Sequence, residues 1–162
     1  MKYLIAIMMI VIGLITPVLC IVKKIQFTQN CSGYLKQAAD ANTAAIALNR
    51  VTVALDYIER NRLTDGYTSV IYTTEDENIG FWYQNIKACK AELEACLNSS
   101  QLKQTNVLMK VRESLMDGSK LTIPAGISRY PNNAIYAIFA WLSFFLIFGG
   151  LIRITYIFVN DY

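Results

Sequence analysis

Two long apolar segments, one near each end of the chain, limit what this sequence can fold into. Residues 3–22 (YLIAIMMIVIGLITPVLCIV) carry no charged side chain, and neither do residues 134–152 (AIYAIFAWLSFFLIFGGLI). A helix of about 20 apolar residues crosses the hydrocarbon core of a bilayer, which is about 30 Å thick. Each segment is therefore expected to form one transmembrane helix, and the lipid bilayer is the first partner that the sequence predicts.

These two segments divide the chain of 162 residues. We expect an N-terminal transmembrane helix over residues 1–22, a helical soluble domain over 23–133, a second transmembrane helix over 134–153 and a short tail over 154–162. The predicted fold class is mostly α, with two transmembrane helices flanking a soluble bundle of about three helices and a short extended segment.

The first apolar segment has some features of a signal peptide, because Lys2 precedes it. Its apolar run is longer than the roughly 7–15 residues of a typical signal, and no small-x-small cleavage pattern follows. Residues 17–20 (PVLC) resemble a lipoprotein cleavage box, but the large Leu19 stands where a small residue is needed. An uncleaved anchor is therefore expected, with Cys20 as a packed or membrane-facing thiol.

The positive charges near the two segments do not settle the orientation. Lys23, Lys24 and Arg129 lie on the side of the middle domain, whereas Lys2 and Arg153 lie on the side of the termini. The signal-like start and three cysteines in the soluble part favour an oxidising compartment. We therefore predict an extracytoplasmic middle domain and cytoplasmic termini.

Two sites in the middle domain match the N-glycosylation pattern, namely residues 30–32 (NCS) and 98–100 (NSS). They have meaning only in a host that glycosylates exported proteins.

The first half of the middle domain is predicted to form one helix from Gln26 to Asn61. Whether this helix is continuous with the first span is left open by the sequence. Its apolar positions recur with alternating spacings of three and four, as in a heptad pattern. This first seam consists of Ala41, Ala44, Leu48, Val51, Leu55 and Ile58.

A turn and a short extended segment follow this helix. Residues 64–66 (TDG) are a turn signal, and residues 67–74 (YTSVIYTT) are rich in β-branched and aromatic side chains. Because no second strand is evident, residues 67–74 are expected to pack as an extended connector. Thr74 and Glu77 match a capping box, which predicts a helix from Glu75 to Leu97.

The predicted helix from Glu75 to Leu97 carries a second seam, with spacings of four and three. Its members are Trp82, Ile86, Cys89, Leu93 and Cys96. A further helix is expected from Gln101 to Asp117, with Gly118 as its C-terminal stop. It shares one apolar face among Leu108, Val111 and Leu115.

The seams are candidate surfaces for association, since heptad-like spacing brings apolar side chains onto one face of a helix. The interface residues predicted on this basis are Leu48, Val51, Leu55, Ile58, Trp82, Ile86 and Leu93. A homo-oligomer or a larger membrane complex is the predicted assembly.

Cys89 and Cys96 cannot form a disulfide with each other within an intact helix. Seven residues rise about 10.5 Å along the axis, whereas the Cα atoms of a disulfide lie within about 7 Å. Cys31 could form a disulfide with either Cys96 or Cys89, and the sequence slightly favours Cys96. Packed thiols are the alternative.

Several kinds of chemistry lack the residues that they need. The chain has no histidine, which removes the commonest general base and metal ligand. No CxxC pair is present for zinc or thiol redox chemistry, and no Gly-x-Ser-x-Gly elbow is present. Lys and Arg are interleaved with Asp and Glu, so the sequence shows no basic stripe that would bind nucleic acid. We predict neither a cofactor nor an enzymatic activity.

Two smaller features remain. The aromatic cluster at residues 80–85 (GFWYQN) is either part of the core or a surface for ligands or partners. Gly149 and Gly150 allow close approach of a second helix inside the membrane, although they do not form a full GxxxG motif.

Three functions fit these observations. The first is a non-catalytic two-span subunit whose helical domain mediates assembly or partner docking in a membrane complex. The second is a membrane-anchored sensor or ligand-binding module. The third, a pore or lysis component, has less support because neither span shows a polar face.

Overall fold

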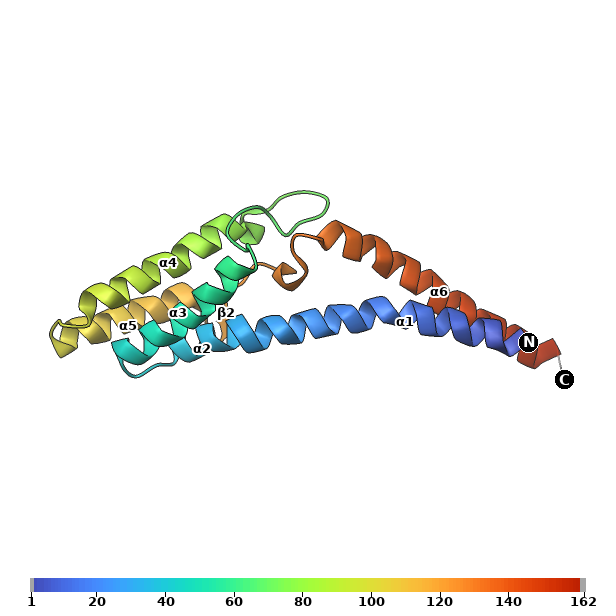
Figure 1. The fold of residues 1–162 in the computed structure, drawn as a ribbon, viewed down its shortest axis with the longest axis horizontal. Coiled ribbons are helices and arrows are strands. Elements are labelled where there is room, and N and C mark those ends of the chain that lie inside the picture. Colours follow the sequence, from blue (N-terminus) through green and yellow to red (C-terminus); the bar gives the residue numbers. More distant parts are fainter. Residues whose placement is uncertain (1, 161–162) are drawn as a thin grey trace. The chain divides into compact units, whose positions relative to one another are not determined.

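The computed structural model describes residues 2–160, and these are mostly helical (Figure 1). The chain forms two compact units. One contains the two ends of the chain, residues 1–24 and 132–162, and the other is Ile25–Pro131. The predicted fold class is confirmed, with two long apolar helices in the first unit and a helical bundle in the second.

The first unit contains most of α1 (Lys2–Phe27) and all of α6 (Asn133–Asn160). Both helices are long and apolar enough to cross a membrane, and most of their apolar side chains are exposed. The α6 helix continues to Asn160, so most of the predicted tail, residues 154–162, is helical in the described part of the chain. Residues 154–159 (ITYIFV) contain neither proline nor glycine, so nothing in them breaks the helix.

The helix that begins with α1 does not stop at the end of the apolar segment. It continues through a π-helical turn, η1 (Thr28–Ser32), into α2 (Gly33–Ala39), so that the first span and the start of the bundle are one helix. The sequence left this continuity open, and the structure shows it.

The single helix predicted from Gln26 to Asn61 is wrong, since it breaks after Ala39. Residues 40–43 (DANT) form the connection, and Thr43 caps the next helix by accepting a hydrogen bond from the backbone N–H of Ile46 at 3.3 Å. Side chains of Asp, Asn and Thr compete for backbone groups and so favour helix ends over helix interiors. As a result α3 (Ala44–Arg60) folds back along α2, and the bundle gains one helix over the predicted three.

The helix predicted from Glu75 starts later than expected. Thr74 Oγ1 does donate to Glu77 Oε2 at 2.8 Å, but this pair closes only a 3₁₀ turn, η2 (Glu75–Glu77). The helix itself, α4 (Ile79–Cys96), is capped by Asn78, whose Oδ1 accepts from the backbone N–H of Phe81 at 2.9 Å. Asn is as good an N-cap as Ser or Asp, and it stands next to the apolar helix start.

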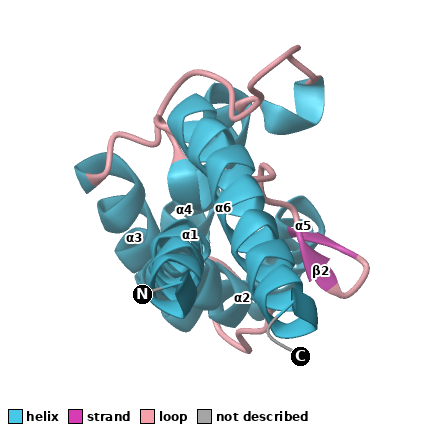
Figure 2. Cartoon of the chain, turned by 90° about the vertical axis from the view of Figure 1, so that its right-hand side faces the viewer, coloured by secondary structure: helices cyan, strands magenta, loops and turns pink. Residues whose placement is uncertain are grey.

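The last bundle helix, α5 (Gln101–Leu115), also ends before the predicted Asp117. A short β-hairpin follows, in which two strands of two residues each pair. They are β1 (Met116–Asp117) and β2 (Lys120–Leu121), drawn in magenta in Figure 2. Gly118 is therefore a hairpin residue, not a helix stop, and its φ of 59° suits the tight turn. A loop with a short 3₁₀ turn, η3 (Ile127–Arg129), completes the unit.

Helices α2, α3, α4 and α5 surround one apolar core. Neighbouring pairs are α2 with α3, α3 with α4, α4 with α5 and α2 with α5, which closes the bundle into a ring. Its largest fully buried aliphatic side chains are Leu35, Val51, Ile58, Ile79, Ile86, Leu93 and Val111. Burial of such side chains is the main favourable term for folding in water.

Candidate functional site

The side chains predicted as an interface lie in the core of the chain's own bundle. Six of the seven are buried, with Val51, Ile58 and Leu93 at 0% exposure, and Leu48 is partly buried against the same core. The two seams pack on each other where α3 meets α4. The periodicity identified buried faces, and the structure shows that these faces are covered from within one chain.

The structure contains neither of the two predicted disulfides. Cys31, Cys89 and Cys96 are buried free thiols. Cys31 lies in η1, beside Tyr57 near the end of α3, whereas Cys96 lies at the other end of the bundle, beside the turn into α5. Cys89 faces Ser114 on α5. Burial raises the pKa of the Cys89 thiol, which keeps it protonated and unreactive at neutral pH.

The aromatic cluster divides between the core and the surface. Trp82 and Tyr83 are buried, whereas Phe81 is 65% exposed. The hydroxyl of Tyr83 donates to Glu59 Oε1 at 2.8 Å and links α4 to α3. This hydrogen bond, together with burial, raises the pKa of Tyr83. The cluster therefore contributes mainly to packing between helices.

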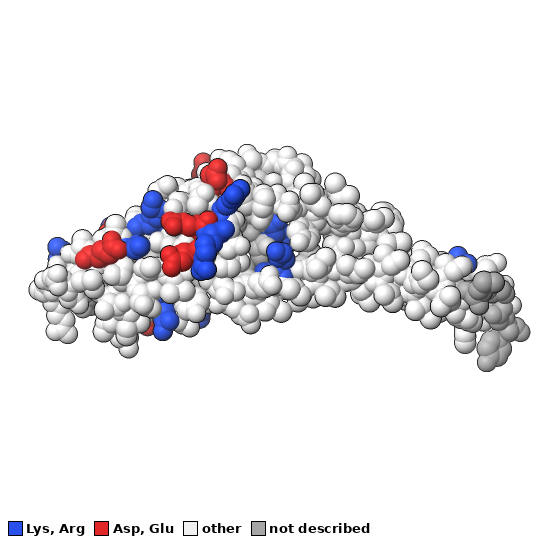
Figure 3. Space-filling view, viewed as in Figure 1, with Lys and Arg blue, Asp and Glu red and all other residues white. Residues whose placement is uncertain are grey.

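Charged side chains of the bundle pair locally. Figure 3 shows Lys and Arg beside Asp and Glu over the bundle surface. Lys110 on α5 forms an ion pair with Glu92 on α4, and Lys90 lies 3.8 Å from Glu94. Among the described residues, no three Cys, Asp or Glu side chains are arranged to hold a metal ion.

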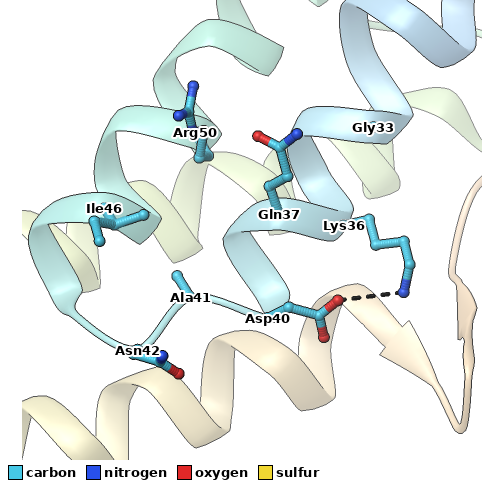
Figure 4. Close-up of a pocket in the computed structure, with 8 residues that line it drawn as sticks. All are labelled: Gly33, Lys36, Gln37, Asp40, Ala41, Asn42, Ile46 and Arg50. Carbon is cyan, nitrogen blue, oxygen red and sulfur yellow. Dashed lines mark hydrogen bonds and ion pairs between the residues drawn. The ribbon is translucent and has the colours of Figure 1, made fainter.

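A shallow groove lies where α2 turns into α3, with a volume of about 540 Å³ (Figure 4). Gln37 and Arg50 line one part, Lys36 and Asp40 pair at 3.2 Å, and Ile46 is 49% exposed. Sequence reasoning missed this groove because it placed residues 40–43 inside a helix. The run of Asp, Asn and Thr was the signal that could have revealed it.

The two span helices approach each other through glycine. A Cβ added to Gly13 on α1 would lie 2.7 Å from Ile147 Cγ1 on α6, and one added to Gly150 would lie 2.7 Å from Ile10 Cγ1. A Cβ this close would force its neighbours to shift. At Gly150 these neighbours include the backbone oxygen of Ala6 at 2.9 Å, so the close approach there depends on glycine. The predicted role of Gly150 in close helix approach is confirmed.

Small residues recur every seven positions along this contact. Ala6 and Gly13 are buried on α1, and Ser143 and Gly150 are buried on α6. Gly13 faces Ser143, and Gly150 faces Ala6, so the two helices run antiparallel. Small residues are typical of helix contacts in membranes, where close backbone approach and dispersion replace the hydrophobic effect. The seven-residue spacing was visible in the sequence, but a search for GxxxG did not find it.

The segment predicted to pack as an extended connector is instead an exposed loop. Tyr67 pairs with Asn78 in an isolated β-bridge, and between them Val70, Ile71 and Tyr72 are 51%, 92% and 74% exposed. Sequence reasoning missed this loop because β-branched and aromatic residues are usually buried.

The comparisons with known proteins returned nothing that identifies the chain: no protein-family model matches it, and neither a curated protein nor a solved structure matches it significantly.

Proposed function

We propose that the protein is a non-catalytic integral membrane protein, a two-span subunit whose helical bundle mediates assembly or partner docking in a membrane complex. The observation that carries the proposal is the antiparallel pair of α1 and α6, with small residues at the contact and large apolar side chains outside. Such a pair suits lipid, because water would penalise so much exposed apolar surface.

The distribution of apolar and charged side chains in the bundle supports a docking role over a catalytic one. Its core is apolar, and Lys36, Lys90 and Lys110 are each engaged with a nearby carboxylate. The exposed surface nevertheless includes large apolar side chains on three helices. These are Ile46 on α3, Phe81 on α4 and Met109 on α5. These are the positions at which a docked partner would remove apolar surface from water.

The mass of the detergent-solubilised full chain tests assembly. We expect a protein mass above that of one 18.3 kDa chain in light scattering corrected for bound detergent. A strict monomer at every concentration, both alone and in native membrane extracts, would contradict the proposal.

We propose further that the bundle is extracytoplasmic and that both termini are cytoplasmic. The signal-like start of the chain supports this orientation. The native bundle thiols are buried, so an exposed thiol is needed for a test. A membrane-impermeant thiol reagent should label Leu102→Cys in intact cells; labelling only after permeabilisation would reverse the orientation.

A sensor or ligand-binding module is the second candidate, favoured by the groove between α2 and α3. Its volume of about 540 Å³ lies in the range of small-molecule sites, about 300–1,000 Å³. Arg50 supplies a cation at its edge, so small carboxylates and inorganic phosphate are the probes to use. A rise in melting temperature of the full chain that is lost in Arg50→Ala would support this function, and unchanged melting with every probe would contradict it.

A further inference from the structure

The loop between α3 and α4 exposes the most accessible apolar side chain of the bundle at its tip. Ile71 is 92% exposed, and its neighbours Val70 and Tyr72 are 51% and 74% exposed. Tyr67, at the base of the same loop, is 44% exposed. An apolar tip of this kind, with tyrosines beside it, has the composition of segments that lie at the boundary between water and lipid.

The base of the loop is held to the bundle by backbone hydrogen bonds. The backbone N–H of Thr68 donates to Glu77 O at 3.1 Å, and that of Ile79 donates to Gly66 O at 2.9 Å. The end of α3 is closed by a hydrogen bond from the N–H of Leu63 to Ile58 O at 2.9 Å, and Leu63 is buried in the core.

This loop lies at the end of the bundle where the chain enters from the first span. The rings of Phe27 and Tyr57 are 6.1 Å apart, and Tyr57 lies in the last turn of α3, just before the loop. Phe27 is five residues beyond Val22, the last residue of the apolar segment. Five helical residues rise about 7.5 Å, so Phe27, against which the end of α3 packs, comes about 7.5 Å after the apolar segment along the helix axis.

The chain also leaves the bundle beside this loop. A Cβ added to Gly66 would overlap the hydroxyl of Tyr130, so Tyr130 packs directly on the base of the loop. The φ of Gly66 is 91°, which also favours glycine. Tyr130 is three residues before Asn133, the first residue of α6, and three residues extend over about 11 Å at most.

We propose that the tip of this loop, residues 70–72, inserts into the interfacial layer of the bilayer that holds the two spans, so that the bundle has a third lipid contact. This inference rests on the proposed function, because it requires α1 and α6 to cross that bilayer. From Gly66 to Ile71 the chain can extend about 17 Å, which exceeds the roughly 11 Å that three residues can cover between Tyr130, at the base of the loop, and the start of α6.

The chemistry of the loop identifies the class of lipid. Glu75 and Asp76 are exposed on the same loop, and their charges oppose contact with anionic headgroups. Insertion is therefore driven by apolar side chains, and the partner is a zwitterionic phospholipid such as phosphatidylcholine. The contact should consequently be insensitive to salt.

An environment-sensitive fluorophore on Ile71→Cys, in the full chain reconstituted into phosphatidylcholine vesicles, tests the proposal. We expect a blue-shifted emission that is quenched by lipids with a nitroxide near the headgroup. Leu102→Cys is the matched control, because Leu102 is 73% exposed at the other end of the bundle, beside the turn between α4 and α5. Its label should remain water-like and should not be quenched. The parent chain, with its native thiols, provides the labelling blank.

Two further variants keep the result decisive. Val70→Ser combined with Tyr72→Ser should reduce both the shift and the quenching at position 71. A label on Leu14→Cys, inside the first span, should be quenched by nitroxides deep in the bilayer. If position 14 is quenched but position 71 is not, the inference is overturned and the proposed function stands. If neither is quenched, both are overturned. A blue shift at position 71 without lipid quenching overturns the inference in favour of a protein contact.

Discussion

The span pair and the bundle are both helical, but they hold their helices together with opposite kinds of side chain. Where α1 meets α6 the buried residues are small, namely Ala6, Gly13, Ser143 and Gly150. In the bundle they are large, as with Leu35, Ile58, Ile79, Ile86 and Leu93. In water, the burial of large apolar surfaces is favourable. In lipid it gives no such gain, so close approach of the two backbones supplies the attraction between the helices instead.

The span pair and the bundle also differ at the ends of their helices. Polar side chains fix the bundle helices in place, as Thr43 does for α3 and Asn78 does for α4. The α6 helix instead continues past Arg153 to Asn160, and residues 154–159 contain neither proline nor glycine to break it. Hydrogen exchange of the full chain in detergent resolves the two regions separately, and it is the measurement for the four predictions that follow.

The largest effect is expected from Leu93→Ala in the bundle. Leu93 is 0% exposed, so its truncation should lower the free energy of opening of α3–α5 by about 2–5 kcal/mol. Leu102→Ala is the matched control at 73% exposure, and it should change the stability by no more than about 0.5 kcal/mol. Equal losses in the two variants would mean that the described core does not stabilise the bundle.

The next effect is expected from Gly150→Val in the span pair. A Cβ at this position would lie 2.9 Å from the backbone oxygen of Ala6, which cannot move aside cheaply. Overpacking costs about 1–3 kcal/mol, so exchange in α1 and α6 should accelerate while the bundle stays protected.

Gly149→Val is the matched control, because a Cβ there would meet only the flexible end of Met9 at 3.2 Å. If both glycine variants behave alike, the helices do not pack through the face that contains Gly150.

A smaller loss is expected from Asn78→Ala, which removes the N-cap of α4. Loss of a capping side chain costs about 1 kcal/mol, and it should appear as faster exchange in the first turn of α4. Thr74→Ala, at the position that the sequence favoured as the cap, should disturb only the 3₁₀ turn. If Thr74→Ala instead destabilises α4 more than Asn78→Ala does, the capping box at Thr74 and Glu77 is the true start of the helix.

The last effect, similar in size to that of Asn78→Ala, is expected from Tyr83→Phe, which removes the hydrogen bond to Glu59. The loss should be about 1 kcal/mol at neutral pH. Because the pKa of Tyr83 is raised in the folded state, its contribution is fully present below the unfolded value of about 10. The contribution is lost as the pH rises through the folded pKa.

The stability difference between the parent chain and Tyr83→Phe should therefore narrow above pH 10, as the tyrosine loses its proton. A difference that stays constant up to pH 12 would show that Tyr83 does not donate to Glu59.

Periodicity predicted the buried faces of the bundle but not what covers them. Leu48, Val51, Leu55 and Ile58 share a face because of their spacing. The same spacing suits a partner chain or a neighbouring helix of the same chain. Only the tertiary structure decides between them, because the break at residues 40–43 lets α3 turn back on α2.

The cysteines show the same limit. The rise of a helix excluded a bond between Cys89 and Cys96 from the sequence alone. The positions of Cys31 and Cys96 at different ends of the bundle depend on which helices run antiparallel, and no local pattern contains that information.

The sequence by itself determined the two apolar helices, the helical character of the region between them and the absence of histidine chemistry. These depend on composition and on spacing within one helix, which act locally. The tertiary structure alone decided which small residues of α1 and α6 meet, where the groove between α2 and α3 opens and that Ile71 stays exposed. Those features depend on contacts between residues far apart in the chain, because exposure and close approach belong to the packed molecule.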